Sequence, residues 1–415
     1  MDRITHVRIR NVRAIEAADL EISRPLTVLI GENGSGKSTI LESLELLRKA
    51  ADSSFMLQFY NLHGGMPSLL RKGAAGMALG VVVEDDAGRL PRLVYEFELA
   101  RQGAGAVVRT ERLLAGAAET GGEPGVALRR VAGKGEMLDG NAGRLVPLPS
   151  GSARDESLAI GSFGALPPNE AVARLLAALG GIEVHLAFHT LASWAGQSVQ
   201  RQTPVRGTTT LFPANRLTLL GHNLGNAWYA LKNLDDAHWR HTMELVRLGL
   251  GSDIDNVNTV PDAGGGNISL VLKRSDLPDP IPASSLSDGQ LAWLAFVALA
   301  RLKDERSLLA FDEPELHLHP ALLGRVVSLL AGLDQTPVVL ATHADRVLEM
   351  LDDPAGAVRV CSIEGSRAVL SRIEPEALRP WLDRFGDLGQ LRASGYLPRV
   401  LVPASGETAK GEGGR

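Results

Sequence analysis

Hydrophobic and polar positions alternate along residues 3–11, which is the period of a half-buried β-strand. Residues 26–30 form a short, β-rich apolar run that ends at a glycine, and this run predicts a buried strand. From Ser38 onward, apolar residues return at the spacing of one helix face. The N-terminal part therefore predicts a half-buried strand, a buried strand and a helix that follows the buried strand.

The middle of the chain has the pattern of a β-rich segment followed by helices. Residues 78–113 hold three apolar runs, with a turn sequence at residues 85–88, and they predict an antiparallel meander. Residues 115–170 are rich in Gly, Ala, Pro and Ser, so we expect loops with short strands there. The elements expected next are a helix over 170–179, a strand over 182–188, a polar loop over 190–215 and helices over 223–231 and 237–248.

Helices and strands alternate in the C-terminal part of the chain. The expected elements are a helix over 290–302, a strand over 308–311, a helix over 321–333 and a strand over 338–341. Such a βαβ pattern implies a mostly parallel sheet with helices packed against it. The predicted fold class is therefore α/β.

Composition and charge narrow the class of protein. The chain has 415 residues, and its 43 basic and 48 acidic residues give a net charge of −5, which excludes a broadly basic nucleic-acid coat. The single cysteine, Cys361, excludes an intramolecular disulfide and a four-cysteine metal site. The first residues lack the apolar segment of a signal peptide, and no stretch approaches the ~20 apolar residues of a membrane helix. We expect a cytoplasmic protein that does not bind membranes.

A phosphate-binding pattern lies between the predicted buried strand and the first helix. Residues 31–38 read GENGSGKS and match G-x-x-x-x-G-K-[ST] at every position. The glycines let backbone N–H groups surround phosphate oxygens, and the helix N-terminus adds positive potential. Lys37 is expected to reach the β- and γ-phosphates of ATP, and the hydroxyl of Ser38 to ligate Mg²⁺. The expected nucleotide contacts are Gly31, Asn33, Gly34, Ser35, Gly36, Lys37, Ser38 and Thr39.

Two acids follow the predicted strand over 308–311. Asp312 is expected to lie beside Ser38 and to hold Mg²⁺ directly or through water. Glu313 is expected to polarise the attacking water, which makes it the candidate catalytic base. Two acids at a strand end can also be a solvated strand terminus, but the phosphate-binding pattern upstream favours the catalytic interpretation.

Residues 286–290 read LSDGQ and precede the predicted apolar helix. They resemble the signature motif of ABC-type ATPases, usually LSGGQ, with Asp288 in place of the first glycine, a variant typical of RecF- and SMC-like members. Ser287, Gly289 and Gln290 would form a second phosphate grip at a helix N-terminus. The resemblance implies that this grip acts across a dimer, on the γ-phosphate bound by the other subunit.

Two further segments resemble the same ATPases. His343 follows an apolar strand and resembles the switch histidine, which implies a bond to the γ-phosphate. Residues 314–320 resemble the segment after the catalytic acid in RecF- and OLD-like ATPases, which implies that Glu315 and His319 contact the dimer partner. A metal site at the two histidines of this segment is disfavoured, because a proline ends the run.

Two weaker resemblances concern Arg13 and a Q-loop glutamine. Arg13 resembles an arginine that RecF- and SMC-like proteins place near the nucleotide, although a surface position is equally consistent. Gln197 lies where the resemblance implies a Q-loop glutamine, with Gln200 and Gln202 as alternatives.

A modest basic cluster in this region favours a solvated loop over a DNA contact. It consists of Arg201, Arg206 and Arg216.

The resemblance is strongest over residues 1–50 and 284–350. It implies a P-loop ATPase head of ABC type, in which helices flank a mixed sheet with an antiparallel meander, and an inserted helical lobe. It also implies ATP and Mg²⁺ as cofactors. The expected division is an ATPase core over 1–50 and 284–400, a β- and loop-rich insertion over 51–190, a helical lobe over 191–283 and a disordered tail over 404–415.

Function follows from the same resemblance to the RecF/SMC/OLD-like group. It implies an ATP hydrolase that forms an ATP-sandwiched homodimer and acts in DNA repair or anti-phage defence, with DNA or a separate effector protein as partner. We expect neither a long coiled coil nor the Toprim nuclease domain of OLD proteins in this chain. A nucleotide-gated switch that controls a partner is the alternative. A transporter ATPase subunit is less favoured, because the segment between Lys37 and Ser287 is long and the signature is a variant.

Overall fold

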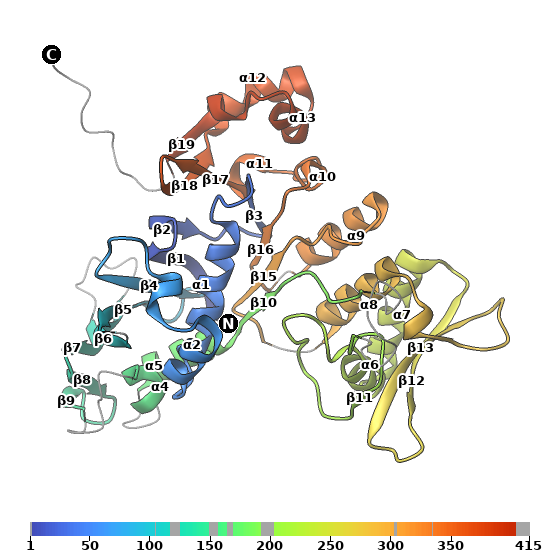
Figure 1. Ribbon diagram of the computed structural model, residues 1–415, viewed down its shortest axis with the longest axis horizontal. Coiled ribbons are helices and arrows are strands. Elements are labelled where there is room, and N and C mark those ends of the chain that lie inside the picture. Colours follow the sequence, from blue (N-terminus) through green and yellow to red (C-terminus); the bar gives the residue numbers. More distant parts are fainter. Residues whose placement is uncertain are drawn as a thin grey trace.

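The computed structural model describes residues 2–103, 105–116, 125–148, 157–163, 169–191, 203–302, 305–333 and 335–403. Within this part of the chain, a 15-stranded sheet forms the centre of the molecule and a 4-stranded sheet lies in a separate lobe. Figure 1 shows this lobe, in green and yellow, on one side of the large sheet, while α12 and α13 lie beyond the sheet at the top of the view.

The large sheet runs in the order β10-β15-β16-β3-β17-β18-β2-β1-β4-β5-β6-β7-β8-β9, with β19 paired to β18. Its parallel half consists of β10 (Ile182–His185), β15 (Leu308–Asp312), β16 (Val338–Ala341), β3 (Leu26–Gly31) and β17 (Val358–Glu364). The other strands are β18 (Arg367–Ile373), β2 (Ile15–Glu21), β1 (Asp2–Val12), β4 (Gly76–Asp85), β5 (Arg92–Gln102), β6 (Gly105–Gly116), β7 (Gly125–Val131), β8 (Lys134–Asp139), β9 (Arg144–Pro147) and β19 (Leu401–Pro403). The predicted α/β class, parallel core and antiparallel meander are confirmed.

Two hydrophobic cores lie on opposite faces of the parallel half. The helices that contribute to the first core are α1 (Lys37–Lys49), α2 (Phe55–His63), α3 (Met66–Leu69), α4 (Ala159–Phe163) and α5 (Glu170–Gly180). The helices that contribute to the second are α6 (Leu224–Lys232), α7 (Asp236–Leu250), α8 (Asp288–Arg301), α9 (Pro320–Ala331), α10 (Asp345–Leu348), α12 (Pro375–Phe385) and α13 (Leu388–Ala393). A short helix, α11 (Pro354–Ala357), precedes β17.

Strand β15 illustrates why the central strands are apolar at nearly every position. Leu308 and Ala310 pack into the first core, and Leu309 and Phe311 pack into the second. Successive side chains of a strand point to opposite faces, so a strand covered on both faces needs apolar residues throughout. The run ends at Asp312, where the strand reaches the edge of the cores and a carboxylate becomes possible.

The lobe contains a sheet that the sequence analysis did not predict. Its strands are β11 (Thr209–Thr210), β12 (Ile254–Pro261), β13 (Asn267–Arg274) and β14 (Ile281–Pro282). The expected helices α6 and α7 are present, and the apolar side chains of β12 and β13 share a core with them and with α8. Asn and Asp at the outward positions of β12 weaken its strand pattern, so sequence periodicity alone favoured a helical lobe.

Other boundaries differ from the predictions for local reasons. The strand expected over 182–188 ends at His185, because the chain then turns and Leu186 N–H donates to the carbonyl of Leu219. The segment expected to hold loops with short strands does contain them, and β7, β8 and β9 extend the meander. The tail over 404–415 lies outside the described residues. None of the helices in the described ranges combines the length and apolar character needed to cross a membrane.

Candidate nucleotide site

The loop of residues 31–38 connects β3 to α1 at the carboxyl end of the parallel strands. Gly34 and Gly36 have φ angles of 78° and 104°, which residues with a Cβ rarely adopt. A Cβ at Gly31 would lie 2.1 Å from the carbonyl oxygen of Cys361 on the neighbouring strand β17. The first turn of α1 holds no acidic residue, so its N-terminus keeps its positive potential. The loop therefore has the backbone shape that phosphate binding requires.

Lys37 lies across this loop and is only 4% exposed. Its Nζ donates to the carbonyl oxygens of Gly31 at 2.9 Å and of Glu32 at 3.1 Å. Burial lowers the pKa of the Lys37 ammonium, and the Asp312 carboxylate raises it in part. An anionic phosphate would give this desolvated ammonium a charged partner, which two carbonyl groups do not supply.

Ser38, in the first turn of α1 after β3, meets Asp312 at the end of β15, and both of these strands flank β16. Ser38 Oγ donates to Asp312 Oδ2 at 2.9 Å, although 274 positions separate them in the sequence. Burial raises the pKa of the Asp312 carboxyl, while the hydrogen bond from Ser38 and the charge of Lys37 lower it. The structure thus brings together the two residues predicted to hold Mg²⁺.

These groups fit a nucleotide with its cation. A hydroxyl and a carboxylate are ligands that Mg²⁺ accepts, and Mg²⁺ completes its shell with waters and phosphate oxygens. Ser35 Oγ is buried and has no hydrogen-bond partner in the described part of the chain. No group of three or more His, Cys, Asp or Glu side chains in the described ranges could hold a metal ion. A cation beside Asp312 would therefore depend on phosphate and water, as Mg²⁺ bound to ATP does.

The remaining two residues predicted in the phosphate-binding loop have different environments. Asn33 is exposed at the tip of the loop, and Thr39 is buried in the first turn of α1. Nothing lies within 4 Å of a Cβ built at Gly34, so the loop faces open space on that side.

Glu313 and His343 approach each other at the ends of neighbouring strands. Glu313 follows β15 with a φ angle of 52°, and its N–H donates to the carbonyl of Ala341 at the end of β16. His343 Nε2 lies 4.0 Å from Glu313 Oε1, and both side chains are partly exposed. A left-handed backbone is strained for a residue with a side chain, and such strain is common at functional sites. The predicted base and the predicted switch histidine therefore share one edge of the sheet.

Glu315 has contacts that the sequence did not predict. Its Oε1 accepts hydrogen bonds from Thr342 Oγ1 and from the N–H of His343, both at 2.8 Å. Oε2 is buried and has no partner among the described residues. The resemblance implied that Glu315 contacts a dimer partner. Within its own chain, Oε1 of Glu315 binds Thr342 and His343, the segment with the predicted switch histidine. His319 is the N-cap of α9, where its Nδ1 accepts from Ala321 N–H at 3.3 Å.

Arg392 reaches the same segment from the C-terminal helix α13. Its Nη1 donates to Asp345 Oδ1 at 2.8 Å and to the carbonyl oxygen of His343 at 3.4 Å. Burial is the main cause of the lowered pKa of Lys37, and the positive charge of Arg392 lowers it further. Nothing in the local sequence around Arg392 indicates this role, because both partners lie nearly fifty positions away, one a backbone carbonyl and the other a partly exposed carboxylate.

The signature segment begins helix α8 with a capping box. Ser287 Oγ accepts from Gln290 N–H at 3.2 Å, and Gln290 Oε1 accepts from Ser287 N–H at 2.9 Å. A Cβ at Gly289 would lie 3.1 Å from the carbonyl oxygen of His317, so the segment packs against the turn that follows Asp312 and Glu313. In the described structure, no hydrogen bond joins Ser287 or Gln290 to the phosphate-binding loop.

The weaker predictions have mixed outcomes. Arg13 has a φ angle of 50°, and its guanidinium pairs with Glu42 on α1 at 2.9 Å, so its proximity to a nucleotide stays a prediction. Arg206 and Arg216 do not belong to a solvated basic loop. Arg206 is 5% exposed, and Arg216 donates to the carbonyl oxygen of Gly180 at 2.6 Å. The residues of this region that lie outside the described ranges are Gln197, Gln200, Arg201 and Gln202.

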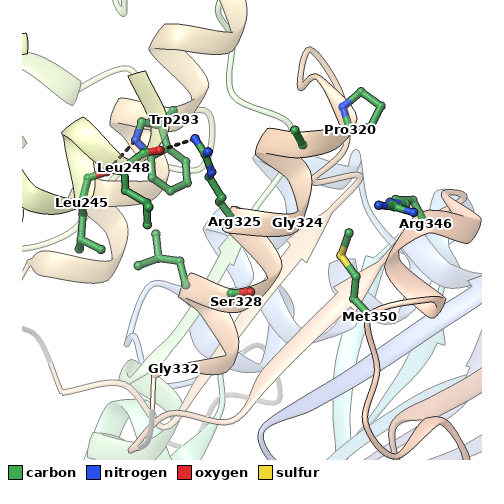
Figure 2. A pocket seen from close by; sticks show the side chains of 12 residues that line it. Leu245, Leu248, Trp293, Pro320, Gly324, Arg325, Ser328, Gly332, Arg346 and Met350 are labelled. Atoms are coloured by element: carbon green, nitrogen blue, oxygen red, sulfur yellow. Dashed lines mark hydrogen bonds between the residues drawn. The ribbon is translucent and has the colours of Figure 1, made fainter. Parts of the chain in front are cut away.

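A groove of about 570 Å³ lies elsewhere, between the lobe and helices α9 and α10 (Figure 2). Its lining includes Trp293, whose Nε1 donates to the carbonyl of Leu245 at 3.2 Å, and Arg325, which donates to the carbonyl of Leu248. None of its lining residues belongs to the phosphate-binding loop or to the acids after β15. The groove marks the junction of lobe and core and is separate from the candidate nucleotide site.

Comparison with known proteins agrees with this geometry. The family described as "AAA ATPase domain" matches residues 3–85, and the family described as "AAA domain, putative AbiEii toxin, Type IV TA system" matches residues 222–349. The DNA replication and repair protein RecF of Cellvibrio japonicus (strain Ueda107) is 31% identical over 88 residues. That match covers 21% of this chain and 22% of RecF, so it spans about a fifth of the relative's length.

Solved structures show the same fold at low identity. An SMC head bound to the C-winged helix domain of ScpA has a TM-score of 0.52 and 13% identity, with 89% of this chain and 96% of that chain covered. An SMC head with an extended coiled coil, bound to a ScpA C-terminal domain from Pyrococcus furiosus, has a TM-score of 0.50 and 12% identity, covering 92% of this chain and 99% of that chain. The fold is that of an SMC-type P-loop ATPase head. Its motifs and these partial matches resemble those of RecF- and SMC-like ABC-type ATPases.

Proposed function

We propose that this protein binds and hydrolyses ATP at the site built around Lys37 and Asp312. The observation that carries the proposal is the hydrogen bond between Ser38 and Asp312, which joins the phosphate-binding loop to the first acid after β15. The approach of His343 to Glu313 adds the residue pair that hydrolysis needs next to that site. AAA and SMC-like relatives support the same reaction.

Each side chain has a separate task in this proposal. Lys37 neutralises the β- and γ-phosphates, and the ammonium exchanges its two carbonyl contacts for phosphate oxygens. Glu313 accepts a hydrogen bond from the attacking water and orients it, and His343 holds the γ-phosphate on the other side. Mg²⁺ held by Ser38 and Asp312 would neutralise charge on the β- and γ-phosphate oxygens. Catalysis is therefore mainly positioning and electrostatic stabilisation.

The active form in this proposal is a head-to-tail homodimer with two ATP molecules between the subunits. Ser287, Gly289 and Gln290 lie at the N-terminus of α8, and the positive potential of a helix N-terminus favours an anion. Their hydrogen bonds in the described chain stay within that helix start. A γ-phosphate held by a second chain is the anion that the resemblance to ABC-type ATPases implies for them.

The biological role that we propose is DNA repair or anti-phage defence together with a separate partner. The match to a DNA replication and repair protein supports the first, and the toxin-system description of the second matching family supports the other. The SMC heads bound to ScpA domains support a protein partner. A second candidate, a nucleotide-gated switch, is favoured by the bond of Arg392 to the His343 carbonyl, because it connects the site to the C-terminal helices.

Steady-state ATP hydrolysis of the wild type and of Glu313→Gln tests the proposal. Both are measured with and without linear duplex DNA at low salt, because phosphate contacts weaken steeply as salt rises. We expect Glu313→Gln to bind ATP, to lose hydrolysis by at least about a hundredfold and to accumulate as an ATP-bound dimer. Unchanged hydrolysis in this variant would refute the assignment of Glu313 as the base.

The DNA arm separates the two candidate roles. A rate that depends on Glu313 and rises with DNA indicates a DNA-responsive ATPase. A rate that depends on Glu313 but ignores DNA favours the nucleotide-gated switch with a protein partner.

A further inference from the structure

Arg206 is a charged side chain in the interior of the lobe and is only 5% exposed. Its nitrogens donate five hydrogen bonds to acceptors from two separate segments. The acceptors and distances are Thr190 O (2.6 Å), Ala283 O (3.3 Å), Ser284 O (3.2 Å), Leu286 O (2.6 Å) and Asp288 Oδ1 (2.6 Å). Four of the five acceptors lie between residues 283 and 288, and two of them, Leu286 and Asp288, belong to the signature segment.

The shape of the guanidinium explains how one residue can hold so many groups. Nε donates to the segment after β10, and Nη2 donates to the first residue of α8. The two N–H groups of Nη1 serve three carbonyl oxygens of the turn before α8, so one of these hydrogens is shared between two acceptors. A guanidinium offers five N–H donors in one plane, whereas an ammonium is a compact charge with three donors. Lysine at this position could therefore replace the charge but not the bonding pattern.

Asp288 gives the same arginine a second task. It stands where the signature of ABC-type ATPases usually has glycine, one residue after Ser287 and at the N-terminus of α8. A carboxylate stabilises a helix N-terminus, but it repels any phosphate that binds there. The ion pair with Arg206 at 2.6 Å offsets the negative charge of Asp288 and directs the carboxylate toward the lobe interior.

We propose that Arg206 is a positioning residue for ATP-dependent dimerisation. It holds the start of α8 in the orientation in which Ser287 and Gly289 bind the γ-phosphate of a second chain, and it neutralises Asp288. The inference rests on the proposed dimer and deepens it, because it names the residue that keeps the acidic signature variant able to bind an anion. It also links the segment after β10 to the signature segment through Thr190.

The experiment uses the full chain in the Glu313→Gln background, where ATP stays bound. Arg206→Met and Arg206→Lys are compared with Arg216→Met, which removes a partly buried arginine that donates to the carbonyls of Gly180 and Glu305, away from the signature. Three quantities are measured for each: the Kd of the monomer for a fluorescent ATP analogue, the Kd of the ATP-dependent dimer by sedimentation, and the thermal midpoint.

We expect Arg206→Met to bind the nucleotide within about twofold of the parent and to weaken the ATP-dependent dimer by at least about tenfold. Arg206→Lys should weaken the dimer to a smaller extent, because it keeps the charge and loses the planar set of donors. Arg216→Met should lower the thermal midpoint without weakening the dimer. Adding Asp288→Gly to Arg206→Met should restore part of the dimer affinity, since the unpaired carboxylate is then absent.

If Arg206→Met forms the ATP-dependent dimer with the same Kd as the parent, the inference is wrong, but the proposed function is not affected. If Arg206→Met does not fold, parent-like dimerisation of Arg206→Lys overturns the inference instead. If the Glu313→Gln parent itself forms no dimer with ATP, the proposed dimer fails, and this inference fails with it.

Discussion

The backbone N–H of His343 donates a hydrogen bond to Glu315 Oε1 at 2.8 Å. The carbonyl oxygen of the same residue accepts from Arg392 Nη1 at 3.4 Å. The backbone of the predicted switch histidine is thus held on both sides by ionisable side chains, one from the turn after β15 and one from α13. Neither contact involves the imidazole, which stays available to a γ-phosphate.

Glu315→Ala is expected to reduce ATP hydrolysis on the order of tenfold with little change in ATP affinity, because it releases Thr342 and His343 without touching the phosphate-binding loop. Steady-state kinetics give kcat and KM separately. Glu315→Gln is the control, since its amide oxygen can still accept both hydrogen bonds and should keep most of the activity. In a His343→Ala background the effect of Glu315→Ala should disappear, and a fully additive loss there would contradict an action through His343.

Arg392→Met is expected to remove about 1 kcal/mol of transition-state stabilisation, or roughly fivefold in kcat, because it leaves Asp345 and the His343 carbonyl without their charged donor. Arg384→Met is the matched control in the preceding helix, where Arg384 packs over the ring of Phe385. Hydrolysis by the two variants is compared at saturating ATP. Equal rates in both would show that α13 does not act on the site.

Gly31→Ala and Gly34→Ala should separate folding from phosphate binding. At Gly31 a Cβ would meet the Cys361 carbonyl at 2.1 Å, so we expect a loss of about 3 kcal/mol in the free energy of unfolding. At Gly34 nothing lies within 4 Å, and only the φ of 78° is unfavourable, so the loss should be about 1 kcal/mol. Urea unfolding gives both values. ATP affinity should fall in Gly34→Ala despite its near-normal stability, and unchanged affinity would argue against phosphate binding at this loop.

Glu183 makes stability depend on pH. Burial alone would raise its pKa, but the hydrogen bond with His185 and the charge of Arg306 lower it from 4.5 to about 2. Because the folded-state pKa lies below the unfolded one, the stabilisation is fully present above pH 4.5 and is lost as pH falls toward 2. We expect Glu183→Gln to lose on the order of 3 kcal/mol at pH 7, since it leaves the buried Arg306 unpaired, and to show a flatter stability profile in that window. Urea unfolding from pH 3 to pH 7, with the exposed Glu364→Gln as control, measures both effects.

The residues of the central site could be predicted from the sequence because their chemistry lies in short contiguous patterns. The glycines, Lys37 and Ser38 form one contiguous motif, and Asp312 and Glu313 directly follow an apolar run. Both groups of residues can therefore be found from the local sequence pattern. The alternation of apolar strands and helices likewise predicts the parallel core, since both faces of those strands must be covered. The sheet of the lobe was missed because its outward Asn and Asp residues weaken the strand pattern.

The tertiary structure decided what holds those motifs in place. Arg206 lies in a polar stretch that favours a solvated loop, yet it is buried and bonded to the signature segment. Glu315 and Arg392 hold the switch histidine through its backbone, and a bond from a side chain to a distant carbonyl or N–H leaves no pattern in the sequence. The sequence does not show whether a charged side chain is solvated by water or paired with other groups of the protein. Only the packing of separate segments decides which partner it has, because burial forces each charge to find one.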